Sequence, residues 1–358
     1  MYPYFAMLAV PGGLALTGRR AGPLWFLLIS FAYFVMIAFR FQVGMDWNNY
    51  VDIYGMKKGW TLTKFIFSRE PGFGLLIWIS ARSGLGVILL NAVSGVVFCW
   101  GFFGVARRCR EPWLAVSIAT PLLVVAFAMS GVRQALAAGI LFHLVAHWED
   151  RRTSQRLLLV ALASAFHFSA IFMMIFVALG SNASHTIRIA GAVLVGLVII
   201  ATIQLEPTAF EAYSRLYLAA GAKLTAPGAI LQIGPLAVAA LLYFFAGEEW
   251  RRANGDSSLQ RGMAWAALLA VPAIFISSVG TYRFALYLWP MAMTVYGGYP
   301  ATIQNGVGRG VYRICVVGAA FALLLGWLLF ANNSYAWVPY QNWLTQPDGA
   351  MLWRSHYR

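Results

Sequence analysis

The sequence contains few charged residues, and acidic residues are the rarest of them. Asp, Glu, Lys and Arg make up 11% of the 358 residues, with 12 Asp and Glu against 26 Lys and Arg, whereas 61% are hydrophobic. Apolar runs repeatedly reach the roughly 18 to 20 residues that a membrane-spanning helix needs. The net charge of +14 would indicate nucleic acid in a soluble protein, but no nucleic-acid motif accompanies it. We interpret the basic excess as positive-inside loops and contacts with anionic lipid or phosphate.

Motifs of several enzyme classes are also absent. The chain has no P-loop, no His-Glu-x-x-His, no Cys/His array and no Gly-x-Ser-x-Gly, so a nucleotide-driven pump or a metalloprotease is unsupported. We expect no metal and no cofactor. Cys99, Cys109 and Cys315 lack metal or redox spacing and are expected to be packing residues. Without a charged leader or a small-residue cleavage site, residues 4–16 are expected to form a short first span.

The apolar runs predict an all-α polytopic integral membrane protein with about ten transmembrane helices in a single domain, 1–358. The expected spans are 3–17, 23–41, 86–106, 112–129, 132–148, 188–205, 229–247, 262–279, 284–301 and 312–331. Two further apolar pieces lie between loops that must share one side of the membrane, so each must return to the side where it started. We expect 72–83 to be a re-entrant or interfacial helix. For 157–180 we favour two half-helices that meet near His167, and one straight span is the alternative.

This topology brings the polar residues near the span ends together on the outer face. Loops 42–71 and 206–228 and the tail 332–358 are expected there, with His167 at the same level. The other residues of this group are Arg40, Asp46, Glu70, Arg133, Gln134 and Arg283. Charges beside a bilayer are costly unless they are paired, face water or hold a polar substrate, so the group predicts a functional site. The alternative is a solvated loop with aromatic anchors.

The chemistry of these side chains favours an anionic substrate. Arginine carries a permanent charge and a planar fork of donors that suits phosphate or pyrophosphate, whereas snorkelling to headgroups is the alternative for each arginine alone. Carboxylates and imidazoles near such cations can act as general bases on a sugar hydroxyl, or can simply pair with the arginines. The candidates are Arg40, Arg133 and Arg283 as anion ligands, with Asp46, Glu70 and His167 as bases.

Four short motifs in the first half of the chain contain most of these candidate residues. They are Arg40-x-x-Val43-Gly44-x-Asp46-Trp47-x-x-Tyr50, Glu70-Pro71-Gly72-Phe73, Val132-Arg133-Gln134-x-x-Ala137 and Ala165-Phe166-His167-x-Ser169-Ala170. Together they cover residues 33–171 and resemble the successive signatures of the EpsG family, which are Wzy-like exopolysaccharide polymerases. Tyr282-Arg283-Phe284 and the stretch from Tyr335 to Trp343 agree less specifically.

The resemblance implies a membrane glycosyltransferase of exopolysaccharide biosynthesis in the bacterial cytoplasmic membrane. Such an enzyme joins undecaprenyl-diphosphate-linked oligosaccharide repeat units at the outer face, and the lipid diphosphate leaves as each glycosidic bond forms. The diphosphate would be held by Arg40, Arg133, Arg283 and Gln134, with Glu70, His167 or Asp46 as the base. Trp47, Tyr50, Tyr213 and Tyr217 would contact sugars, unless they are interface-belt residues. A chain-length regulator protein is a candidate partner, and nucleic acid is not expected.

Other activities are compatible with the same residue types. A glycan ligase would use the same lipid-linked donor, arginines and base, although a larger outer loop would favour it. A lipid-linked oligosaccharide transporter would show midplane charges and an internal repeat, and no repeat is evident. An acyltransferase would need a histidine-centred site that opens to the cytoplasm.

Overall fold

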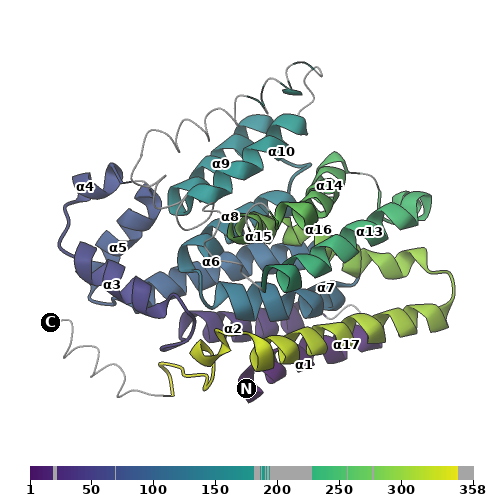
Figure 1. Ribbon diagram of the computed structural model, residues 1–358, viewed down its shortest axis with the longest axis horizontal. Helices are drawn as coiled ribbons and strands as arrows, with labels where there is room; N and C mark the ends of the chain where they lie inside the picture. The colour runs from purple at the N-terminus through teal and green to yellow at the C-terminus, as the bar shows by residue number, and fades with distance from the viewer. Residues whose placement is uncertain are drawn as a thin grey trace.

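The computed structural model describes residues 1–18, 22–68, 70–180, 228–255, 257–275 and 278–345, with a few isolated positions between 186 and 193. Over this part of the chain the regular structure is helical, apart from an antiparallel bridge between Arg40 and Asn342. The longer helices lie roughly along one axis, and α3, α4 and α5 are gathered at one end of the bundle (Figure 1). The expected all-α fold is confirmed.

The helices follow the predicted apolar segments closely. The first group is α1 (Tyr2–Thr17), α2 (Pro23–Ala38), α3 (Trp47–Lys57), α4 (Leu62–Ile66), α5 (Pro71–Ser83), α6 (Val87–Arg108), α7 (Pro112–Ala119) with the π-helix η1 (Thr120–Ala128), and α8 (Val132–Ala146). The next are α9 (Thr153–Phe166), η2 (Phe168–Phe172) and α10 (Met173–Leu179). The last are α13 (Gly228–Asn254), α14 (Ser258–Ala273), α15 (Ser278–Ala285), η3 (Leu286–Leu288), α16 (Trp289–Gly298), η4 (Tyr299–Thr302), α17 (Gly306–Phe330) and η5 (Ser334–Ala336). The predicted span 188–205 lies almost entirely outside the described residues.

Helix length separates the candidate membrane spans into two groups. Among the described residues, α6, α13 and α17 are long and apolar enough to cross a membrane. The apolar helices α2, α7 with η1, α8, α9, and η2 with α10 have only 10–17 residues. A helix of about 16 residues is roughly 24 Å long, which is less than the roughly 30 Å hydrocarbon core of a bilayer. The predicted number of ten spans is therefore not confirmed.

The centre of the bundle is the contact between α6 and α8. Ser94 Oγ donates to the Val132 carbonyl at 2.9 Å. Further along the same two helices, toward their C-terminal ends, a Cβ atom added to Gly101 would lie 2.0 Å from the Gly139 carbonyl oxygen. In both pairs the residue on α8 follows its partner on α6 by 38 positions, so the two helices run parallel. The short distance at Gly101 shows that their backbones touch. The N-terminal end of α8 consequently lies far from the basic C-terminal end of α6.

The segment 157–180 is broken at the predicted place. Helix α9 ends at Phe166, and His167 has extended backbone angles (φ −151°, ψ 117°) before η2 and α10 begin. Helix α10 packs back against α9, and Gly180 lies against Trp148, which precedes α9. The chain therefore folds back on itself here, and the straight span is excluded.

The residues after α17 form a segment that we call the C-terminal strap, residues 334–345. It pairs with residues 39–44 through the backbone: Gly44 N donates to Ala336 O at 2.9 Å, and Trp343 N donates to Phe39 O at 2.7 Å. Trp337 is 1% exposed, and its Nε1 donates to the Val125 carbonyl at 2.8 Å. The strap thereby fixes the loop that follows α2 against the core. The rest of the predicted outer tail, 346–358, lies outside the described residues.

Candidate active site

A polar cluster forms where the start of α5, the start of α8 and the break after α9 meet. Pro71 occupies the first turn of α5, where a missing N–H costs nothing, so Glu70 becomes the N-cap residue. A Cβ atom at Gly72 would lie 3.1 Å from the Ala165 carbonyl oxygen, so only a very small residue lets α5 approach α9 this closely. This approach brings Glu70 beside His167.

Glu70 connects three groups. Its Oε2 accepts a hydrogen bond from Arg133 Nη1 at 2.6 Å in a salt bridge. Its Oε1 lies 2.9 Å from His167 Nδ1 and also accepts from Phe168 N at 3.3 Å. The side chain of Glu70 is 13% exposed and that of Arg133 is 31% exposed, so the cluster is partly buried but open on the arginine side.

The environment of Glu70 keeps this carboxyl ionised. Burial acts to raise its pKa, but the hydrogen bond from His167 and the nearby charge of Arg133 outweigh that effect and lower the pKa from 4.5 to about 2. A carboxylate with so low a pKa is a weak proton acceptor at neutral pH. Glu70 is therefore better suited to orient its neighbours than to remove a proton itself.

His167 is left with one ring nitrogen for chemistry. Because an ionised carboxylate only accepts hydrogen bonds, we infer that Nδ1 carries the proton shared with Glu70 Oε1, 2.9 Å away. In the neutral imidazole the other nitrogen, Nε2, is then a proton acceptor. Among the described residues, the hydrogen bond of the His167 ring is the one from Nδ1, so Nε2 is the nitrogen left for a substrate. A carboxylate that fixes the tautomer of a histidine is the arrangement of a general base.

Asp46 lies on the other side of the start of α8. Ser130 Oγ lies 3.3 Å from both the backbone nitrogen and the Oδ2 atom of Asp46. Gly44 makes this contact feasible, because it has a φ of +101° and a Cβ atom there would lie 2.3 Å from the Met129 carbonyl oxygen. Tyr50 completes the link, since its hydroxyl accepts from the Arg133 backbone N–H at 3.3 Å.

Arg283 and Gln134 approach the cluster from α15 and α8. Gln134 Nε2 donates to the Arg283 carbonyl at 2.8 Å, so Gln134 holds the backbone that carries Arg283. The charge of Arg283 lies within electrostatic range of His167. Gln134 is itself only 7% exposed, and this contact gives it a positioning role rather than an open phosphate-binding surface.

Arg40 does not share the carboxylate of Glu70. Its side chain is 2% exposed, and Nη1 donates to the Ile37 carbonyl of the preceding turn. The strap covers it, because Arg40 and Asn342 form the antiparallel bridge. The charge of Arg40 acts on Asp46 and Tyr50. In this conformation Arg40 packs beneath the 40–46 loop. Its guanidinium is not accessible for the diphosphate contact that the sequence predicted.

The predicted sugar-contacting aromatics fall into two groups. Trp47 and Tyr50 are described and are only 6% and 4% exposed. Trp47 packs edge-on against Phe41, with ring centroids 5.7 Å apart. Both rings therefore serve packing in this conformation and present no face to a sugar. Tyr213 and Tyr217 lie outside the described residues, as does the loop 206–227.

Two groups near the cluster were not expected from the sequence. Tyr287 Oη and Ser169 Oγ are 2.8 Å apart, which ties η3 to the residues just after His167. Tyr287 follows Arg283 by four residues, so a helical periodicity search from Arg283 would have found it. Lys57 lies within electrostatic range of Glu70 and Arg133, and only the folding of α3 onto α5 brings it there.

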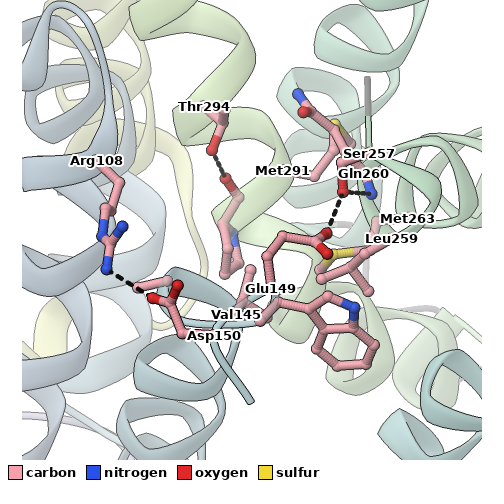
Figure 2. Close-up of a pocket in the computed structure, with 13 residues that line it drawn as sticks. Arg108, Val145, Glu149, Asp150, Ser257, Leu259, Gln260, Met263, Met291 and Thr294 are labelled. Carbon is pink, nitrogen blue, oxygen red and sulfur yellow. Dashed lines mark hydrogen bonds and ion pairs between the residues drawn. The ribbon is translucent and has the colours of Figure 1, made fainter. Parts of the chain in front are cut away.

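A separate cavity of about 200 Å³ lies at the other end of α8 (Figure 2). Its acidic side chains have partners, since Asp150 Oδ2 bonds Arg108 Nη2 at 3.1 Å and Glu149 Oε1 lies 3.4 Å from Ser257 Oγ. Among the described residues, no group of three or more His, Cys, Asp or Glu is placed to hold a metal ion. The polar cluster around Glu70 is therefore the candidate active site.

The comparisons with known proteins gave one match. Neither the curated proteins nor the solved structures contain a match to this chain. A family model matches residues 24–342, which include every described residue of the polar cluster. This range is most of the chain, and the protein therefore belongs to the EpsG family.

Proposed function

We propose that the protein is a polysaccharide polymerase of the cytoplasmic membrane that uses lipid-diphosphate-linked oligosaccharides as substrates. Family membership supports a polymerase-like membrane function. The observation that carries the specific proposal is the contact of one carboxylate, Glu70, with both Arg133 and His167. This arrangement provides a cation for a phosphate and a base for a hydroxyl group within one site.

Arg133 is the proposed ligand of the diphosphate. Its Nη1 bonds Glu70, but its Nε has no hydrogen-bond partner among the described residues. The side chain remains 31% exposed, and a buried donor without a partner is costly unless a ligand satisfies it. Arg283 is the second proposed ligand, since its charge lies within electrostatic range of His167.

The proposed reaction forms one glycosidic bond and breaks one sugar–phosphate bond. His167 Nε2 takes the proton from the terminal hydroxyl of the acceptor unit, and that oxygen attacks the anomeric carbon of the donor chain. The bond between that carbon and the lipid diphosphate breaks as the charge on the leaving group grows. Arg133 and Arg283 stabilise this charge, Glu70 stabilises the imidazolium, and the proton then passes to the released diphosphate or to solvent.

The experiment uses the purified full-length protein in nanodiscs with a lipid-diphosphate-linked oligosaccharide from the producing strain. No nucleotide or metal is added, and products are separated by size. We expect a ladder of repeat units with the wild type and none with Arg133→Ala, whereas Arg252→Ala should give a normal ladder because Arg252 lies on α13 with a side chain that is 77% exposed.

Three results would contradict the proposal. A normal ladder from Arg133→Ala would remove this residue from the mechanism. Substrate that stays unchanged with a folded wild-type preparation, but is consumed when a second glycan acceptor is added, would identify a ligase. Movement of the intact lipid-linked substrate across a vesicle membrane would identify a transporter.

A further inference from the structure

A second groove lies at the basic end of the bundle, between α2, α6 and α8. Its volume is about 540 Å³. It is distinct from the proposed active site, because His147 follows Arg133 by 14 residues along α8, which corresponds to roughly 21 Å of helix. Arg107 and Arg151 belong to basic loops, and the positive-inside rule predicts the cytoplasmic side for such loops.

One wall of the groove is apolar and faces outward. Phe31 on α2 is 61% exposed, and Val96 and Trp100 on α6 are 53% and 51% exposed. Val96 and Arg107 are both on α6, about 16 Å apart along the helix axis, which is close to half of the roughly 30 Å hydrocarbon thickness. An apolar wall of this length matches the acyl chains of one leaflet.

The other end of the groove is cationic. Arg107 lies there with its guanidinium 5.2 Å from the centre of the Phe26 ring, and it forms no ion pair within the described part of the chain. Arg151 Nη2 lies 3.3 Å from His143 Nε2, and His143 in turn stacks on Trp100 with ring centroids 3.7 Å apart. The stack joins the cationic end directly to the apolar wall.

The neighbouring charges leave this end positive. Arg108 also lines the groove, but Asp150 neutralises it at 3.1 Å. Arg107 and Arg151 remain as positive charges, and His147 adds a ring whose centroid lies 4.4 Å from that of His143. We infer that the groove binds one anionic phospholipid, with its phosphate near Arg107 and Arg151 and an acyl chain along Phe31 and Trp100.

Phosphatidylglycerol is the probe for this site, and phosphatidylcholine is its neutral counterpart. Native mass spectrometry of the full chain in detergent should count bound lipids during a titration. We expect phosphatidylglycerol to bind the wild type more tightly than phosphatidylcholine does. Arg107→Gln and Arg151→Gln should each weaken it by about fivefold, since one basic side chain near an anionic surface contributes about that factor. The matched control is Arg252→Gln, which removes an exposed arginine on α13.

Photo-crosslinking tests the same site without any substitution. Phosphatidylglycerol with a photoreactive acyl chain should label peptides that contain residues 27–34 and 96–108 in the wild-type protein. The inference would be overturned if phosphatidylcholine bound as tightly as phosphatidylglycerol, or if soluble glycerol phosphate displaced the lipid as well as unlabelled phosphatidylglycerol does. Labelling confined to other helices would also overturn it. The result does not depend on polymerase activity, so it stands or fails separately from the proposed function.

Discussion

Glu70 is the residue through which the polar cluster responds to acid. Its pKa is about 2 in the folded protein, against the usual 4.5. A carboxyl group with a depressed pKa stabilises the folded state above pH 4.5, and this contribution disappears as the pH falls from about 4.5 to 2. The shift corresponds to a stabilisation on the order of 3 kcal/mol at neutral pH.

Glu70→Gln tests this linkage. The variant should unfold at lower temperature than the wild type at pH 7, because it leaves Arg133 without its carboxylate. The difference should shrink steadily as the pH is lowered below 4.5, and thermal unfolding in detergent at several pH values measures it. A difference that stays constant from pH 7 to pH 3 would show that the charge of Glu70 contributes nothing.

His167 should control the rate of the proposed reaction and its pH dependence. His167→Gln keeps a hydrogen bond to Glu70 but removes the proton acceptor, so the rate of polymer formation should fall by roughly 10²- to 10⁴-fold. The remaining rate should no longer rise with pH in the range where the wild-type rate does. Retention of the wild-type pH profile in this variant would assign the base to another group.

Most residues of the cluster could be identified from the sequence, but the contacts between them could not. Glu70, His167 and Arg133 were recognisable because charge beside apolar runs is rare and costly. The burial of Arg40 was not recognisable, since it depends on the strap at the far end of the chain, which pairs with it through Asn342. The tautomer of His167 likewise required the distance to Glu70.

At the scale of elements, the contact of α6 with α8 depends on glycine. Gly101→Ala would place a Cβ atom 2.0 Å from the Gly139 carbonyl oxygen, so the helices would have to separate. We expect a loss of about 1 to 3 kcal/mol or more, seen as a lower unfolding temperature.

Gly104→Ala is the matched control on the same helix. A Cβ atom there meets nothing within 4 Å, and alanine favours a helix over glycine by about 1 kcal/mol. This variant should be as stable as the wild type or more stable. If both alanine variants had equal stability, the backbone contact would not constrain the bundle.

The break at His167 could be predicted, whereas the contact of Gly101 with Gly139 could not. The break followed from charge parity, because basic loops on both sides of 157–180 required the chain to return. The contact joins two glycines that are 38 residues apart in sequence, and glycines are frequent in apolar helices for many reasons. A backbone contact of this kind can be recognised only from the three-dimensional structure.

At the scale of the whole molecule, the strap links the end of the described chain to the loop that carries Asp46. Trp337 is 1% exposed and packs edge-on against Trp327, with ring centroids 4.7 Å apart. Trp337→Ala should cost about 3 to 5 kcal/mol and reduce polymer formation along with the unfolding temperature. Tyr335→Ala is the control, because Tyr335 is 71% exposed. Full stability of Trp337→Ala would mean that the strap is dispensable.

The sequence was sufficient for the fold class but not for the number of spans. Every predicted apolar segment within the described residues became a helix, because hydrophobic runs carry a strong signal. Length did not settle which helices cross the membrane, since α1, α2 and α8 have 16, 16 and 15 residues. Short helices can cross a locally thinned bilayer or stop inside the protein, and composition does not distinguish these cases.

The position of the strap also has a consequence for how the protein is made. Residues 336–343 hold the 39–44 segment in place, yet the ribosome adds them after every other described part of the site. The early helices therefore enter the membrane with this loop still without its backbone partners. We expect the nascent protein to remain inactive until synthesis has passed Trp343, so that polymer formation cannot begin before the strap exists.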